Sequence, residues 1–62
     1  MKKPVCKLIG KDGNVFNLIC IASKALKRAN MNNEAKEMTS KCFGADSYTE
    51  ALNIIMDYVD VE

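Results

Sequence analysis

The residues best suited to bind a ligand form a short turn-forming stretch near the N-terminus. Gly10, Lys11, Asp12, Gly13 and Asn14 follow an apolar run and precede a helical pattern. Glycine lets a backbone approach a ligand closely, and the start of a helix presents unpaired N–H groups and a positive dipole end. We therefore expect a cradle for a small anion or a nucleotide phosphate. A plain turn followed by an N-cap requires the same residues, and the spacing matches neither the Walker nor the G-x-G-x-x-G pattern.

Phe16 lies two residues beyond this stretch and completes the candidate ligand site. Its ring could stack on a nucleotide base. A buried core position is the ordinary alternative for a phenylalanine. The predicted ligand-binding residues are thus Gly10 to Asn14 together with Phe16.

No catalytic site is indicated by the residues. The chain lacks histidine, so acid–base chemistry would need carboxylates, lysines, tyrosines or cysteines, and no pair of these has a spacing that defines a site. Cys6, Cys20 and Cys42 have no C-x-x-C spacing and no identifiable activating base. Burial as small apolar residues is the expected role of all three. We expect a protein that is not an enzyme, with no metal site and no cofactor.

A strong helical pattern follows the turn. Asn14 is a suitable N-cap, and from Val15 to about Ala29 apolar residues recur at intervals of three and four. Phe16, Cys20 and Ile21 lie off this stripe. The first half of the helix is therefore apolar nearly all round and must be covered on more than one face. The stripe itself consists of Val15, Leu18, Ile19, Ala22, Ala25, Leu26 and Ala29.

Two further helices are predicted. The second runs from an Asn33 cap to about Phe43 and stops at Gly44, a residue type favoured at helix C-termini. The third begins at Ser47, which has capping-box spacing to Glu50. Their apolar stripes are Ala35, Met38 and Cys42, and then Tyr48, Ala51, Leu52, Ile55 and Met56.

Both ends of the chain favour strands. Val5–Ile9 is β-rich, and residues 58–62 alternate apolar and acidic side chains. The expected fold is a single α+β domain over residues 1–62, in the order β-α-α-α-β with the terminal strands paired. Because two strands make a weak sheet and a 62-residue chain buries only about 60% of its surface, we expect a homodimer or higher oligomer to complete it.

Charge is divided unevenly along the chain. Residues 1–30 contain seven basic and one acidic residue, and residues 31–62 contain two basic and seven acidic residues. This division favours packing of the two halves on each other or head-to-tail pairing of two chains. Lys24, Lys27 and Arg28 form a modest basic face, but the acidic second half disfavours nucleic acid. No apolar run is long enough for a membrane span or a signal peptide, so a cytoplasmic location is expected.

The two ends of the chain resemble a family of very short, uncharacterised proteins encoded by phages, prophages and their bacterial hosts. The resemblance rests on Leu8-Ile9-Gly10-Lys11-Asp12-Gly13-Asn14-Val15-Phe16 and on Met56-Asp57-Tyr58-Val59-Asp60-Val61-Glu62, with Tyr48 and Leu52 in addition. That family carries an apolar-x-Gly-x-Asp-Gly-Asn-Ala-Phe opening and an acidic-Tyr-Val-acidic-Val-Glu close. It tends to have glycine where this chain has Cys20, and the middle of the chain matches poorly.

This resemblance implies an accessory protein acting in the cytoplasm of a bacterial host cell. One expectation is a homodimeric sponge that sequesters a small anionic or nucleotide signal of anti-phage defence. The alternative is an inhibitor that docks on a host protein, and a small nucleic-acid-binding regulator is a second alternative. The first would use the turn at Gly10–Asn14 and Phe16, whereas the inhibitor would use an exposed apolar or charged face.

Overall fold

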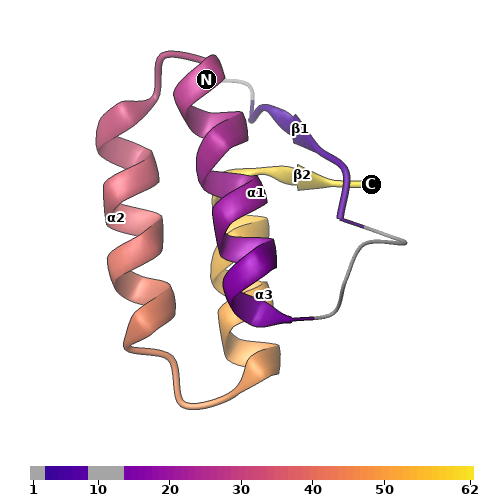
Figure 1. Ribbon diagram of the computed structural model, residues 1–62, viewed down its shortest axis with the longest axis vertical. Coiled ribbons are helices and arrows are strands. Elements are labelled where there is room, and N and C mark those ends of the chain that lie inside the picture. Colours follow the sequence, from indigo (N-terminus) through magenta and orange to yellow (C-terminus); the bar gives the residue numbers. More distant parts are fainter. Residues whose placement is uncertain (1–2, 9–13) are drawn as a thin grey trace.

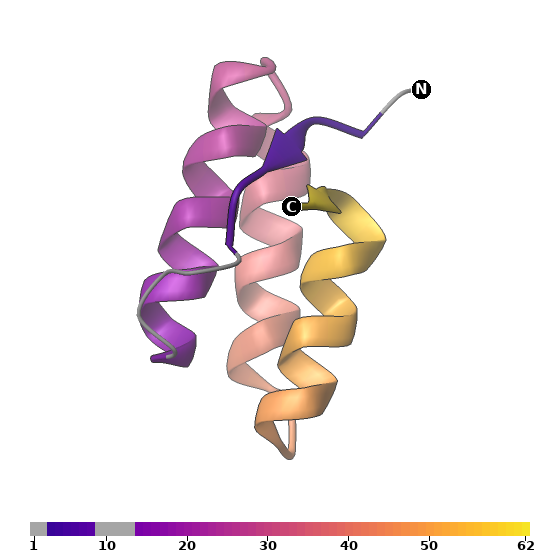
Figure 2. The ribbon, with the colours of Figure 1, turned by 90° about the vertical axis from the view of Figure 1, so that its right-hand side faces the viewer.

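The computed structural model describes residues 3–8 and 14–62, which form three helices and two short strands (Figure 1). The order is β1 (Val5–Cys6), α1 (Val15–Arg28), α2 (Asn32–Phe43), α3 (Tyr48–Tyr58) and β2 (Asp60–Val61). The helices run up, down and up beside one another, and the strands lie at the end where α1 and α3 finish (Figures 1 and 2). The predicted β-α-α-α-β order and the small α+β fold are confirmed.

The two strands pair in parallel, with Val5 opposite Asp60 and Cys6 opposite Val61. Backbone bonds continue the ladder on both sides: the Asp60 amide donates to the Pro4 carbonyl over 2.9 Å, and the Leu8 amide donates to the Glu62 carbonyl over 2.8 Å. Parallel strands need a long crossover connection, and here the three helices provide it.

Both strands are shorter than predicted. The first was expected over Val5–Ile9, and of this range Ile9 lies outside the described residues. The second was expected from Tyr58, but Tyr58 is the last residue of α3. Tyr58 follows the buried Ile55 by three positions, so it also continues the helical stripe, and its side chain contacts α2.

The core lies between the three helices and beneath the strands. It follows the predicted stripes of α1 and α2 closely, except that Val15 and Ala25 are only half-buried and Ala29 is exposed. The predicted stripe of α3 is correct only in part: Ala51 and Ile55 are buried, whereas Tyr48 and Met56 are exposed because they line an open hollow between α1, α3 and the strands. The fully buried Ala22 and Ala35 give the surfaces of α1 and α2 small side chains within this core. The buried residues are Cys6, Leu8, Leu18, Ile19, Ala22, Leu26, Ala35, Met38, Cys42, Ala51, Ile55 and Val59.

The turn between α1 and α2 is a Schellman motif. Asn30 adopts a left-handed backbone with φ of 61°, its amide donates to the Lys27 carbonyl over 3.0 Å, and the Met31 amide donates to the Leu26 carbonyl over 2.9 Å. The half-buried Met31 packs on the core, as the residue after such a turn commonly does. This turn is so short that α2 already begins at Asn32.

The prediction that Asn33 caps α2 is therefore wrong. Asn33 is the second residue of the helix, and the capping position belongs to Met31, which makes no side-chain capping bond. Packing of Met31 on the core sets the start of α2, in place of a polar cap. At the other end α2 stops at Gly44 as expected, in a right-handed conformation with φ of −90°.

Side chains cap both ends of α3. The Ser47 hydroxyl accepts from the Glu50 amide over 3.1 Å, as predicted, while the Glu50 carboxylate accepts from the amide of Asp46, one residue before the cap. At the C-terminus, where the last turn has no basic residue, Lys3 donates to the Met56 carbonyl over 3.1 Å. Lys3 thus places a positive charge at the negative end of the helix dipole.

Candidate binding surface

Two phenylalanine rings are exposed side by side at one end of the helices. Phe16, in the first turn of α1, is 62% exposed, and Phe43, the last residue of α2, is 64% exposed. Their ring centroids are 5.9 Å apart and their planes are tilted by 36°. The antiparallel arrangement of α1 and α2 brings these two positions together although they are far apart in sequence. Large exposed apolar surface is typical of binding sites.

Two adjoining hollows between α1 and α2 lie beside the rings and share Ser23, Lys27, Thr39 and Phe43, and together they form what we call the aromatic–lysine groove. It is lined by Phe16, Ile19, Cys20, Ser23, Lys24, Lys27, Ala35, Lys36, Thr39, Ser40 and Phe43. Phe16, Cys20 and Phe43 make one end apolar, and three lysines make the other end basic. A neighbouring cavity beside the rings continues this surface to Tyr48 and Asp46 at the start of α3.

The three lysines of the groove are not neutralised by nearby carboxylates. Among the described residues the one ion pair joins Lys41 and Glu37, which lie elsewhere on α2. The uneven charge division of the sequence is thus not expressed as ion pairs between the two halves of the described chain. The positive charge of Lys24, Lys27 and Lys36 faces solvent, where a ligand can meet it.

Of the predicted ligand site, the structure places Asn14 and Phe16 only. Gly10, Lys11, Asp12 and Gly13 lie outside the described residues. Asn14 caps α1 as predicted: its side-chain oxygen accepts from the Phe16 amide over 2.9 Å. That bond occupies one of the N–H groups expected to hold an anion.

The exposure of Phe16 overturns the view that it is a core residue. The buried residues of α1 are Leu18, Ile19, Ala22 and Leu26, and Phe16 lies outside this set, beside the groove. Sequence reasoning missed its partner Phe43, together with Lys36 and Thr39. One signal pointed to Phe43: it is a large apolar residue next to Cys42 and off the stripe that Cys42 ends.

Two of the cysteines are buried as expected and one is not. Cys6 and Cys42 are in the core, where burial raises the pKa of both thiols. The Cys42 thiol also donates to the Ala51 carbonyl over 3.8 Å. Cys20 is exposed in the groove, one helical turn after Phe16, which corrects the prediction that it is buried. The described residues hold no cluster of three potential metal ligands.

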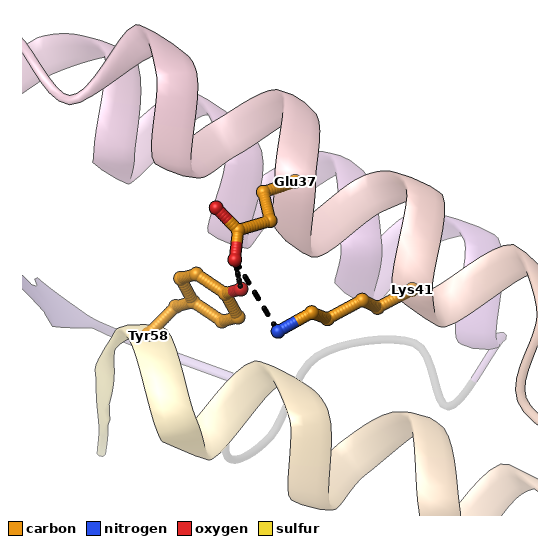
Figure 3. Close-up of polar contacts among 3 residues, drawn as sticks. All are labelled: Glu37, Lys41 and Tyr58. Atoms are coloured by element: carbon orange, nitrogen blue, oxygen red, sulfur yellow. Dashed lines mark hydrogen bonds and ion pairs between the residues drawn. The ribbon is translucent and has the colours of Figure 1, made fainter.

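A polar cluster that uses α2 residues outside the groove joins α2 to α3 (Figure 3). The Tyr58 hydroxyl donates to a Glu37 carboxylate oxygen over 2.8 Å, and the Lys41 ammonium lies 3.3 Å from the same oxygen and 5.3 Å from the Tyr58 ring centroid. The hydrogen bond from Tyr58, with help from Lys41, lowers the pKa of Glu37, and the contacts of Lys41 with Tyr58 and then with Glu37 raise the pKa of Lys41. The hydrogen bond between Tyr58 and Glu37 joins α3 to α2. Both pKa shifts lead away from neutral pH, which makes these groups poorly suited to proton transfer there.

Comparisons with known protein families, curated proteins and solved structures gave no match to this chain. The resemblance to short phage and prophage proteins therefore stays a prediction. The described part of the chain contains no helix of the length and apolarity needed to cross a membrane.

Proposed function

We propose that this chain is a non-catalytic accessory protein that binds another protein through the aromatic–lysine groove. The observation that carries this proposal is the pair of exposed rings, Phe16 and Phe43, at the apolar end of the groove. Aromatic residues at the centre of an interface commonly supply most of its binding free energy. The two rings are already in contact, so binding need not bring them together.

The shape of the surface favours a protein over a small molecule. A site for a small ligand typically encloses about 70–90% of the ligand's surface. The groove runs open along two helices, and its lining is spread from the first turn of α1 to Lys27 and from Lys36 to the end of α2. A long, open surface of this kind suits the side of another polypeptide.

A nucleotide or other small anion is the second candidate ligand. It is favoured by one observation: an exposed aromatic ring, Phe16, and an exposed ammonium group, Lys24, line the same groove. A base could stack on the ring while its phosphates contact the lysines. The sponge predicted from the sequence used the turn at Gly10–Asn14 together with Phe16, and this candidate site shares Phe16 with it.

The predicted phage or prophage context suggests the partner. We propose a host protein of the bacterial cytoplasm, with this chain acting as its inhibitor. Support comes from the sequence resemblance at both ends of the chain and from the exposed apolar surface of Phe16 and Phe43, which an inhibitor needs.

We also propose that the chain forms a homodimer through a second, uncharged face. Leu8, Leu18, Tyr48, Leu52, Met56 and Val61 line a hollow between α1, α3 and the strands. Tyr48 and Met56 are 43% and 45% exposed there. Among the residues that the structure describes, none that lines this hollow is charged, so two copies can meet there without like-charge repulsion between these residues, whereas pairing through the groove would bring lysines of both copies together. Apolar faces are typical of homodimers.

The protein-binding function is tested by capture from bacterial lysate on the immobilised chain. The double variant Phe16→Ser/Phe43→Ser should lose a stoichiometric partner, with Kd weakened about thirtyfold or more, which corresponds to about 2 kcal/mol. Val5→Ser is the matched control, because Val5 is 55% exposed in β1 and lies outside both the groove and the proposed dimer face. Both variants change exposed residues, so circular dichroism should show the wild-type helix content.

Two results would count against the proposal. A partner that binds the double variant as well as wild type does not use the groove. A nucleotide panel that raises the melting temperature of wild type but not of Lys24→Ala, with no protein captured, would favour the sponge.

A further inference from the structure

The two ends of the aromatic–lysine groove differ in chemistry and are separated along the helices. With a rise of about 1.5 Å per residue, Phe16 and Lys27 are roughly 16 Å apart along α1, and Lys36 and Phe43 are roughly 10 Å apart along α2. Both helices therefore present an apolar end and a basic end, and their antiparallel packing places the two apolar ends side by side and the two basic ends side by side. A partner of about three helical turns would span both ends.

An acidic residue beside the rings reinforces this polarity. Glu37 is held by Tyr58 and Lys41 on the other side of α2. Asp46 lines the cavity beside the rings, at the apolar end of the groove. Negative charge on a partner is thus attracted at the lysine end and disfavoured at the ring end.

The backbone of the groove has little to offer a partner. Residues along its walls belong to α1 and α2, whose amides and carbonyls bond within each helix except near the ends. An extended peptide laid here would leave its own backbone groups without protein partners. A helix brings a backbone that is already satisfied, and its apolar side chains can enter the groove as in other helix-in-groove complexes.

On these grounds we propose that the occupant of the groove is an acidic amphipathic helix of the partner protein. Its apolar residues contact Phe16, Cys20 and Phe43, and a group of Asp or Glu residues two to three turns away along the helix faces Lys24, Lys27 and Lys36. This proposal rests on the proposed protein-binding function and adds the chemistry and polarity of the partner segment. The aromatic end supplies affinity, because exposed ion pairs contribute little each, and the lysines set orientation, association rate and salt dependence.

A selection from an unbiased library of random 16-residue peptides, displayed on ribosomes, tests this chemistry directly. The wild-type chain should enrich peptides with apolar residues at helical spacing followed or preceded by an acidic group. Affinity for those peptides should fall at least tenfold in the triple variant Lys24→Glu/Lys27→Glu/Lys36→Glu, which should itself enrich basic peptides. Lys7→Glu is the control for added negative charge, because Lys7 is exposed near β1 and outside the groove.

The same selection can overturn the inference. Enriched peptides without an acidic group, or acidic peptides that bind the triple variant as well as wild type, would show that the lysines do not define the partner. If no peptide is enriched while a lysate protein still binds through Phe16 and Phe43, the helix proposal fails and the protein-binding function stands. If acidic helical peptides bind but no lysate protein does, the partner chemistry stands and the host target fails.

Discussion

Asn30 follows α1 and Gly44 follows α2, and their backbones adopt opposite conformations. Alanine in place of glycine should therefore destabilise the fold at position 30 and stabilise it at position 44. Asn30 has φ of 61°, in the left-handed region, and Gly44 has φ of −90° in the right-handed region. Both residues are exposed, so packing contributes little to either substitution. The comparison therefore isolates the effect of the backbone conformation on the free energy of unfolding.

The magnitudes follow from the local geometry. An alanine in the left-handed region is less stable than a glycine by about 1 kcal/mol, so Asn30→Ala should destabilise the fold by about that amount relative to Asn30→Gly. At Gly44 an added Cβ would lie 3.6 Å from the Lys41 carbonyl oxygen, an ordinary contact. Gly44→Ala should therefore stabilise the fold by about 0.4–1 kcal/mol, because the unfolded chain loses freedom.

Urea unfolding followed by far-ultraviolet circular dichroism measures these differences, with an unchanged m-value as the check that the surface exposed on unfolding is the same in all variants. For a chain of this size about 1 kcal/mol corresponds to roughly 4–8 °C in Tm. If Asn30→Ala is as stable as Asn30→Gly, the left-handed turn after α1 is refuted. If Gly44→Ala is destabilising, α2 does not end in the right-handed conformation.

Three other predictions concern exposure, pH and assembly. Iodoacetamide should add one label to the folded chain, at Cys20, and the remaining two thiols should react only after unfolding; a Cys20→Ser variant that still labels quickly would contradict this. Tyr58→Phe should lower Tm at pH 7, and this loss should shrink as the pH falls through and below 4.5, the usual pKa of Glu. The reason is that the hydrogen bond favours the ionised form of Glu37 and is lost when Glu37 is protonated. A difference in Tm that is unchanged at strongly acidic pH would refute the contact. Sedimentation equilibrium should give a dimer for wild type and for Phe43→Glu but a monomer for Met56→Glu; a monomeric wild type at high micromolar concentration would remove the proposed dimer face.

Local signals accounted for the helices. The stripes of α1, α2 and α3 were readable because a buried face repeats every three to four residues, and the caps at Asn14 and Ser47 because a side chain there bonds an amide two or three positions away. The cap bonds join residues two or three positions apart, and the spacing of each stripe repeats within one helix, so both patterns can be read from the residue order.

Signals that depend on distant packing were ambiguous. Tyr58 fits both an alternating strand and a helical stripe, and only its contact with Glu37, 21 residues earlier, selects the helix. Asn33 has the chemistry of a cap, but the Schellman turn and the packing of Met31 place the start of α2 before it.

The candidate binding surface depends almost wholly on the tertiary structure. By itself the sequence determined that the start of α1 carries more apolar residues than one buried face can use, and that its later turns are basic. It could not determine whether Phe16 and Cys20 are covered, because that depends on what packs beside them. The antiparallel packing of α1 and α2 decided it, by setting Phe43 next to Phe16 and Lys36 beside the lysines of α1 while leaving all of them at the surface. Residues 27 positions apart share no local interaction that sequence periodicity could record, so their meeting is a property of the fold.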